Sequence, residues 1–181
     1  MKVTGTAWTF PQDDINTDLI RLETYSHLPL AEQAQHCLET LDPAFARAVV
    51  PGDIVIGGRN FGCGSSRPAH AALKALGIGA VIAESFGRIF FRSSISDSLL
   101  VTPCPGIVAF VKAGDRIELD AAAGEVRNLT SGRVLACPPL PGVLREIVQC
   151  GGEKGWIKSR LARDEPQEAM AEDVILDLLA K

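Results

Sequence analysis

The chain has 181 residues, a formal net charge of −4, and 46% apolar and 22% charged residues. That length is enough for one domain with a real core, and the proportions are those of a globular protein. The acidic balance without a basic patch argues against nucleic acid as a partner, and no apolar run approaches the ~20 residues that span a membrane. The first residues enter a strand pattern rather than a signal peptide, so a cytoplasmic location is expected.

Strand and helix patterns alternate through most of the chain. Strands are predicted at residues 2–9, 53–57, 79–84, 99–102, 115–119, 125–128 and 133–136. Helices are predicted at residues 30–38, 43–49, 68–76, 86–94, 140–149, 153–163 and 169–179. The alternation in the middle of the chain predicts a crossover with locally parallel strands, whereas the later short strands predict a small β-layer. The residues from 11 to 27 are predicted to be a polar connector and an irregular loop.

The chain is predicted to divide near its C-terminus. One domain is expected over residues 1–163, and a linker with a C-terminal helix over residues 164–181. The linker prediction rests on Asp-Glu-Pro at 164–166, and the helix prediction on apolar residues at helical spacing after it.

The segment 60–67, Asn-Phe-Gly-Cys-Gly-Ser-Ser-Arg, carries the strongest functional signal. It lies between a predicted buried strand and a predicted helix, and Pro68 suits the first turn of that helix. A glycine-rich turn at this place exposes backbone N–H groups at the positive end of the helix dipole, which favours a carboxylate or a phosphate. Arg67 can add a two-point grip on a carboxylate.

Common glycine-loop motifs do not match this segment. A Walker A loop needs Lys and then Ser or Thr after its last Gly, but Cys63 and Gly64 follow here. A dinucleotide fingerprint needs a small residue where Arg67 stands, and the nucleophile elbow G-x-S-x-G does not occur. Two interpretations remain from the local pattern: a small anion site with reactive hydroxyls, or a tight turn whose serines cap the helix.

The cysteines give no metal-site pattern. They number five, with no C-x-x-C pair, at positions 37, 63, 104, 137 and 150. This argues against a disulfide framework and against a zinc or iron–sulfur site built by this chain alone. Buried free thiols are expected for all of them except Cys63, which lies inside the glycine-rich segment.

Four further polar residues are given weaker roles. Arg88 and Arg92 are expected to be solvated or ion-paired. His70 either supports Arg67 or packs against its neighbours, and packing is favoured. The sequence places no obvious group of partners around His36.

The segment 60–67 resembles the signature of the small subunit of 3-isopropylmalate dehydratase and of the swivel domain of aconitase and homoaconitase. The resemblance covers about residues 2–119. It includes Asp-Ile-Asn-Thr-Asp-Leu-Ile at residues 14–20, which is similar to the family's early D-x-I-x-T-D-x-I segment, the approach at 41–45 and 50–54, and the following strand and helix at 77–92. It implies an α/β fold, namely a swivel-type layered β/β/α domain with a mixed, partly parallel sheet.

The resemblance also implies a reaction and the residues that perform it. Enzymes of this superfamily isomerise a hydroxy acid by dehydration and rehydration. A [4Fe–4S] cluster binds the substrate hydroxyl at its open iron and acts as a Lewis acid. Ser65 matches the serine that takes a proton next to a carboxylate, and Ser66 and Arg67 match positions that hold the substrate carboxylate. Gly64 lets the backbone approach the substrate closely. The resemblance therefore implies catalytic Ser65 and substrate-binding Gly64, Ser66 and Arg67.

A partner polypeptide follows from the same resemblance. Three cysteines of a separate large subunit hold the cluster in the split members of the family, and this chain has no comparable triplet. The cluster is expected on that large subunit, with no metal bound by this chain alone. The expected partners are the large subunit and a small di- or tricarboxylate.

The loop after Asp18 departs from the family pattern. Family members commonly continue with Ile-Pro-x-x-Tyr-Leu and then residues that read the substrate side group. By count from Asp18, Tyr25 takes the Tyr position and Ser26 the Leu position. His27 takes the place where homoaconitase-type enzymes have Arg and isopropylmalate enzymes an apolar residue. Tyr25 and His27 are therefore predicted substrate-binding residues, and Pro68 is a second departure, since Glu is usual there.

The predicted function is that of the small subunit of a hydro-lyase of the 3-isopropylmalate dehydratase type, an enzyme of leucine biosynthesis. Activity is expected only together with a cluster-bearing large subunit. Two alternatives stay open. One is a small subunit of the homoaconitase, dimethylmalate or citramalate type. The other is a non-catalytic anion-binding domain of the same fold.

Overall fold

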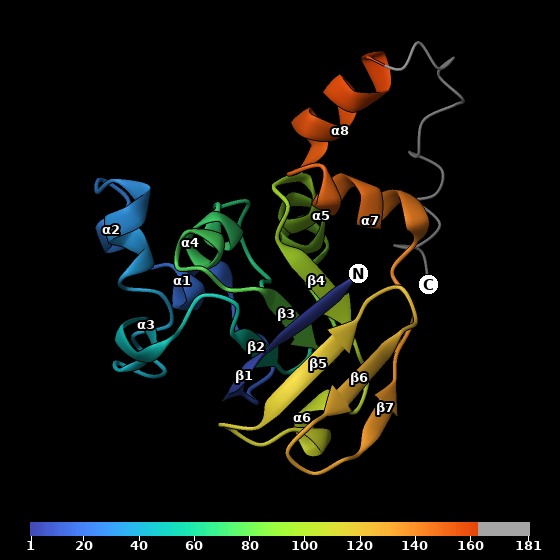
Figure 1. Ribbon diagram of the computed structural model, residues 1–181. Helices are drawn as coiled ribbons and strands as arrows, with labels where there is room; N and C mark the ends of the chain where they lie inside the picture. The colour runs from blue at the N-terminus through green and yellow to red at the C-terminus, as the bar shows by residue number, and fades with distance from the viewer. Residues whose placement is uncertain (163–181) are drawn as a thin grey trace.

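Residues 1–162 are described by the computed structural model, and the strands among them form one mixed sheet (Figure 1). The strand order is β4-β3-β2-β1-β5-β6-β7. The strands are β1 (Lys2–Phe10), β2 (Ile54–Gly57), β3 (Ala80–Ala83), β4 (Leu100–Pro103), β5 (Arg116–Asp120), β6 (Glu125–Asn128) and β7 (Val134–Ala136).

Strand β1 joins two different kinds of sheet. Its C-terminal part, from Ala7 to Phe10, pairs in parallel with β2, which continues to β3 and β4. Its N-terminal part, from Lys2 to Thr6, pairs antiparallel with β5, which continues to β6 and β7. We call the first set of strands the parallel half and the second the antiparallel half.

The helices are distributed around the parallel half. They are α1 (Thr17–Ile20), η1 (Glu23–Tyr25), α2 (Leu30–Ala34), α3 (Phe45–Ala48), α4 (Ala69–Ala75), α5 (Arg88–Ser96), α6 (Ile107–Phe110), α7 (Gly142–Gln149) and α8 (Glu153–Leu161). Helices α2, α4, α5, α7 and α8 contact one another in succession, and α6 packs against β2 and β3 (Figure 1). Every residue of β2 and β3 is buried, as expected for parallel strands covered by helices.

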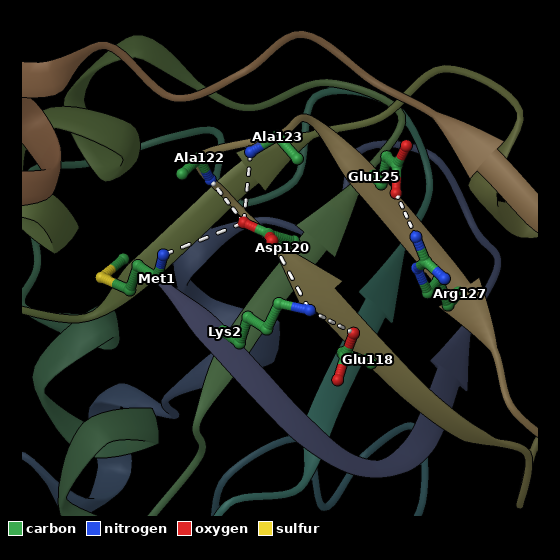
Figure 2. Close-up of polar contacts among 8 residues, drawn as sticks. All are labelled: Met1, Lys2, Glu118, Asp120, Ala122, Ala123, Glu125 and Arg127. Carbon is green, nitrogen blue, oxygen red and sulfur yellow. Dashed lines mark hydrogen bonds and ion pairs between the residues drawn. The ribbon is translucent and has the colours of Figure 1, made fainter.

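The antiparallel half has one face toward solvent. Along β5 and β6, buried residues such as Ile117, Leu119 and Val126 alternate with more exposed ones. Figure 2 shows charged side chains on these strands: Lys2 reaches Glu118 at 3.1 Å and Asp120 at 3.8 Å. Because successive side chains of a strand point to opposite faces, the charged residues lie on one face of the antiparallel half and the apolar residues on the other.

A buried carboxylate fastens β1 to the start of β2. Asp53 is 5% exposed and accepts hydrogen bonds from the backbone N–H groups of Thr6 and Val50, both at 3.0 Å, and from the indole N–H of Trp8 at 2.9 Å. Burial acts to raise the pKa of Asp53, but these hydrogen bonds outweigh it and lower the pKa below its ordinary value of 3.8. The ionised form is thus the one that the fold stabilises.

The predicted mixed, partly parallel sheet is confirmed, and most predicted elements occur within a few residues of their expected places. Three short elements were not predicted: α1, η1 and α6. The helix predicted at 30–38 is too long, because it ends at Ala34 and Leu38 adopts a positive φ of 56°, which no regular helix allows. The predicted division at 163/164 and the C-terminal helix lie outside the described residues.

None of the helices described within residues 1–162 has the length and the apolar character that a bilayer crossing requires.

Candidate active site

The segment 60–67 forms the loop between β2 and α4, and main-chain hydrogen bonds hold it against the residues that precede α1. The N–H of Gly62 donates to the carbonyl of Ile15 at 2.7 Å, and the N–H of Thr17 donates to the carbonyl of Cys63 at 2.9 Å. Two stretches that are far apart in the sequence therefore lie side by side. Both stretches belong to the family resemblance.

The other side of the loop is fixed by the residues between β3 and α5. Phe61 donates its N–H to the carbonyl of Ser85 at 3.0 Å and accepts from the N–H of Gly87 at 2.9 Å. Its ring is fully buried and meets Phe86 and Phe90 edge-on, with centroids 6.2 and 5.6 Å away. Packing within this aromatic cluster thus holds the loop in place.

Both glycines of the loop are required by its path. Gly62 has a φ of +73°, and a Cβ there would lie 2.1 Å from Cγ of Phe90. Gly64 has a φ of +95°, and the nearest atoms to a Cβ there, on Asn16 and Thr17, are 3.6 Å away. Gly62 is therefore fixed by packing as well as by its backbone angle, whereas Gly64 is fixed by the angle alone.

Ser65 stands at the exposed tip of the loop beside a buried hydroxyl. Its Oγ lies 3.2 Å from Oγ1 of Thr17, and either oxygen can donate. Thr17 is 2% exposed, and its own backbone is bonded to the loop, so its hydroxyl is held in place by the fold. A fixed hydroxyl next to Ser65 is able to donate to that oxygen when it carries negative charge.

The backbone around Ser65 offers further donors. Within residues 1–162, the N–H groups of residues 64–67 have no hydrogen-bond acceptor, and Ser66 is exposed without a side-chain partner. The serines do not cap α4, since that helix begins at Ala69 after Pro68 and has no side-chain cap. The capping alternative is therefore wrong, and Pro68 is the N-cap residue rather than part of the first turn.

Arg67 lies between two carboxylates of its own chain. An oxygen of Asp18 contacts its Nη1, and Oε2 of Glu23 lies 3.0 Å from its Nε. Asp18 comes from α1 and Glu23 from η1, two of the three elements that the sequence did not predict. The Arg67 side chain is 33% exposed, so it is reachable from solvent at the edge of this cluster.

The predicted substrate-reading loop is held against the turn that follows α2. The ring of Tyr25 stacks on that of His36, with centroids 3.7 Å apart. A hydrogen bond with Glu39 raises the pKa of Tyr25, and Glu39 also contacts Nδ1 of His36 at 2.6 Å. His36 therefore has partners that the sequence did not reveal. His27 is exposed and has no hydrogen bond, ion pair or ring contact with other described residues, and the substrate-binding roles of Tyr25 and His27 stay predictions.

A buried polar pair supports the same loop. Arg21 and Gln33 are each 7% exposed, and Nε of Arg21 donates to Oε1 of Gln33. The amide nitrogen of Gln33 then donates to the carbonyls of Leu28 at 2.6 Å and Ser26 at 3.4 Å. The main chain of the loop is thus tied to α2, while its side chains at positions 26 and 27 stay free to face solvent.

His70 and two arginines lie apart from this cluster. His70 is 5% exposed, its Nε2 lies 2.7 Å from an Asp97 oxygen, and its ring meets Phe90 edge-on. It packs as favoured but also has a charged partner, and it makes no contact with Arg67. Arg88 and Arg92 are exposed and form no ion pair with other described residues.

The cysteines do not form a metal site in the described part of the chain. Residues 1–162 contain no group of three or more His, Cys, Asp or Glu side chains arranged to hold a metal ion. Cys37 and Cys104 are buried, and burial raises the pKa of Cys37 to about 12. The expectation of burial is wrong for Cys137, which is half-buried, and for Cys150, which is exposed on the turn after α7.

Sequence reasoning missed the contribution of Thr17, Asp18 and Glu23. Thr17 and Asp18 belong to the segment 14–20 that resembles the family, and this resemblance was the signal that could have marked them as site residues. Glu23 gave no such signal, because only the fold brings η1 next to Arg67.

The class of the domain follows from comparison with known proteins. Residues 12–104 match the profile of the family described as the Aconitase C-terminal domain. The matched range contains the whole cluster around Ser65, from the segment before α1 to the end of the parallel half.

Whole-chain relatives narrow this class. The 3-isopropylmalate dehydratase small subunit of Heliobacterium modesticaldum is 41% identical and covers 90% of this chain and 98% of its own. The isopropylmalate/citramalate isomerase small subunit of Methanocaldococcus jannaschii is also 41% identical, with the same coverage. A crystal structure of 3-isopropylmalate dehydratase from Methanocaldococcus jannaschii superposes with a TM-score of 0.84 at 36% identity, over 90% of this chain and 97% of that one. The chain belongs to the family of 3-isopropylmalate dehydratase small subunits.

Proposed function

We propose that this chain is the small subunit of a hydro-lyase that isomerises a 2-hydroxy di- or tricarboxylate, with 3-isopropylmalate as the leading substrate. The observation that supports this most directly is the exposed Ser65 hydroxyl held 3.2 Å from the buried Thr17 hydroxyl, next to Arg67 and free backbone N–H groups. Ser65, Arg67 and the N–H groups belong to one loop that the fold fixes from both sides, and Thr17 at the start of α1 lies against it.

The proposed chemistry of this chain begins with Ser65 as general base. It takes the proton from the carbon next to a substrate carboxylate and returns it when the double bond is rehydrated. Serine is intrinsically a poor base, so its oxyanion needs stabilisation. Thr17 Oγ1 and the N–H groups of residues 64–67 are of the right type and place to supply it, and Arg67 holds a carboxylate of the substrate.

The other half of the active site is proposed to come from a large subunit. Within residues 1–162 no group of three or more His, Cys, Asp or Glu side chains is arranged to hold a metal ion, which supports a [4Fe–4S] cluster held by that partner. When bound, the cluster supplies Lewis-acid activation of the leaving hydroxyl. The relatives are themselves called small subunits, which supports a two-subunit assembly.

The substrate is proposed within a narrow chemical range. The relatives carry names that include 3-isopropylmalate dehydratase and isopropylmalate/citramalate isomerase. The exposed polar residues Ser26 and His27 in the substrate-reading loop favour a smaller or more polar side group than isopropyl, because polar atoms lose water against an aliphatic group without gaining a partner. Citramalate, dimethylmalate and homoaconitate are the alternatives.

The test is reconstitution with a large subunit of the family from the same source. The purified chain alone is expected to be colourless and inactive, and the assembled enzyme to be brown and to turn over at least one of these four acids. Comparison of kcat/KM among them ranks the substrates. Turnover by the isolated chain would contradict the proposal, and an assembly that binds these acids without turnover would favour the non-catalytic anion-binding domain.

A further inference from the structure

Arg67 is engaged by carboxylates before any substrate is present. A guanidinium offers two edges to carboxylate oxygens, and here Asp18 contacts Nη1 while Glu23 lies 3.0 Å from Nε. Two negative charges against one positive charge leave this cluster with a formal charge of −1. A substrate carboxylate that binds Arg67 therefore competes with the carboxylates of Asp18 and Glu23.

The two carboxylates are held differently. Asp18 has a short side chain on α1, where Asn16 Oδ1 accepts its backbone N–H at 3.0 Å, and the adjacent Thr17 is bonded to the loop. Glu23 has a longer side chain, is 58% exposed, and begins the one-turn helix η1, which has no side-chain cap. The Asp18 side chain is similarly exposed, at 53%, but it is shorter and has fewer bonds to rotate, so Glu23 is the carboxylate that side-chain rotation moves further from Arg67.

We propose that Glu23 occupies the place of a substrate carboxylate on Arg67 and has to leave when the substrate binds. Glu23 then sets the affinity of the enzyme for dianionic substrates: it keeps the guanidinium oriented in the free chain and weakens binding of a carboxylate from outside. This inference rests on the proposed function, because it takes Arg67 as the group that holds the substrate.

Replacement of Glu23 by Gln tests this directly. Glu23→Gln keeps the size of the side chain but removes its charge, so a substrate carboxylate no longer displaces an ion pair. KM for 3-isopropylmalate and citramalate is expected to fall about three- to tenfold on the assembled enzyme, with the effect on KM rather than on kcat. The decrease in KM is expected to shrink as the salt concentration rises, because Asp18 and Glu23 are solvent-exposed and salt screens exposed charges.

Glu32→Gln is the matched control. Glu32 is an exposed glutamate on α2 that has no ion pair with other described residues, so the same change in net charge is made away from Arg67. It is expected to leave KM within twofold of wild type. An equal decrease in both variants would show a general effect of net charge and would overturn the specific role of Glu23.

A second measurement does not depend on turnover. The Nε–Hε signal of Arg67 in the full-length isolated chain is followed by NMR while malonate is added. The signal is expected to shift at lower malonate concentrations in Glu23→Gln than in wild type and in Glu32→Gln. Unchanged or weaker malonate binding, or a raised KM, would overturn the inference. An assembled wild-type enzyme without turnover would instead contradict the proposed function, while the malonate titration still decides the role of Glu23.

Discussion

The two halves of the sheet use charge in opposite ways. In the parallel half, β2 and β3 are buried along their whole length, and polar groups gather in the loop after β2, where Ser65 and Arg67 have defined neighbours. In the antiparallel half, charges spread over a solvent face, as between Lys2, Glu118 and Asp120 in Figure 2. Under the proposed function the charges of the first region act on a substrate, whereas those of the second lie on the surface, so equal substitutions in the two are expected to have very different effects.

The largest effect is expected from Ser65→Ala in the parallel half. Loss of the general base should lower kcat of the assembled enzyme by about 10²- to 10⁴-fold, while circular dichroism and partner assembly stay unchanged because the side chain is exposed. Steady-state kinetics on the preferred hydroxy acid measures this. A decrease smaller than about tenfold would assign the proton transfer to another group.

The next prediction compares a core position of the parallel half with a surface position of the antiparallel half. Ile82 is fully buried in β3, and Ile82→Ala should lower the free energy of unfolding by about 2–5 kcal/mol through lost burial and the cavity left behind. Val134 in β7 is 53% exposed, and Val134→Ala should change it by less than about 0.5 kcal/mol. Urea denaturation of both variants gives the comparison, and equal losses would contradict the difference in packing.

Most of the fold was predictable because its elements have strong local patterns, such as the apolar runs of β2 and β3 and the glycine-rich segment between them. The short helix α1 was not, because it is set by the cap on Asn16 and by contacts with a loop far along the chain. The same distinction holds for the site. Ser65 and Arg67 follow from a motif, and Thr17 belongs to a second motif, but the contact of Thr17 with Ser65 and the place of Glu23 beside Arg67 follow only from tertiary structure.

Asp53 provides a smaller effect at the boundary of the two halves. Asp53→Asn places an amide N–H₂ against N–H donors of β1 and the preceding turn, and should lower the free energy of unfolding by about 1–3 kcal/mol. Because the folded pKa of Asp53 lies below 3.8, its stabilisation is present above the unfolded pKa and is lost as pH falls through the folded value.

The measurement for Asp53 is unfolding in urea between pH 7 and pH 2.5. Wild type should lose more stability than Asp53→Asn as the pH falls below about 4, so that the two curves converge in acid. Parallel curves would show that the Asp53 carboxylate does not contribute through its charge.

The smallest effect is expected from Lys2→Gln in the antiparallel half. The Lys2 side chain is 57% exposed, and its contacts with Glu118 and Asp120 are surface ion pairs that salt screens. The free energy of unfolding should change by less than about 1 kcal/mol, and the difference should vanish in 1 M salt. A loss as large as that of Ile82→Ala would contradict the proposed contrast between the halves.

Because β1 belongs to both halves, the order of events during synthesis is constrained. Residues of β2, β3 and β4 are made before β5, whose first residue is Arg116, so the parallel half can assemble while the antiparallel half is still incomplete. At a translation rate of about 5–20 residues per second, the N-terminal part of β1 then keeps an unpaired edge for about one to three seconds, while the chain from the end of β4 to the end of β5 is made. During that interval the unpaired edge offers a template for pairing with another chain.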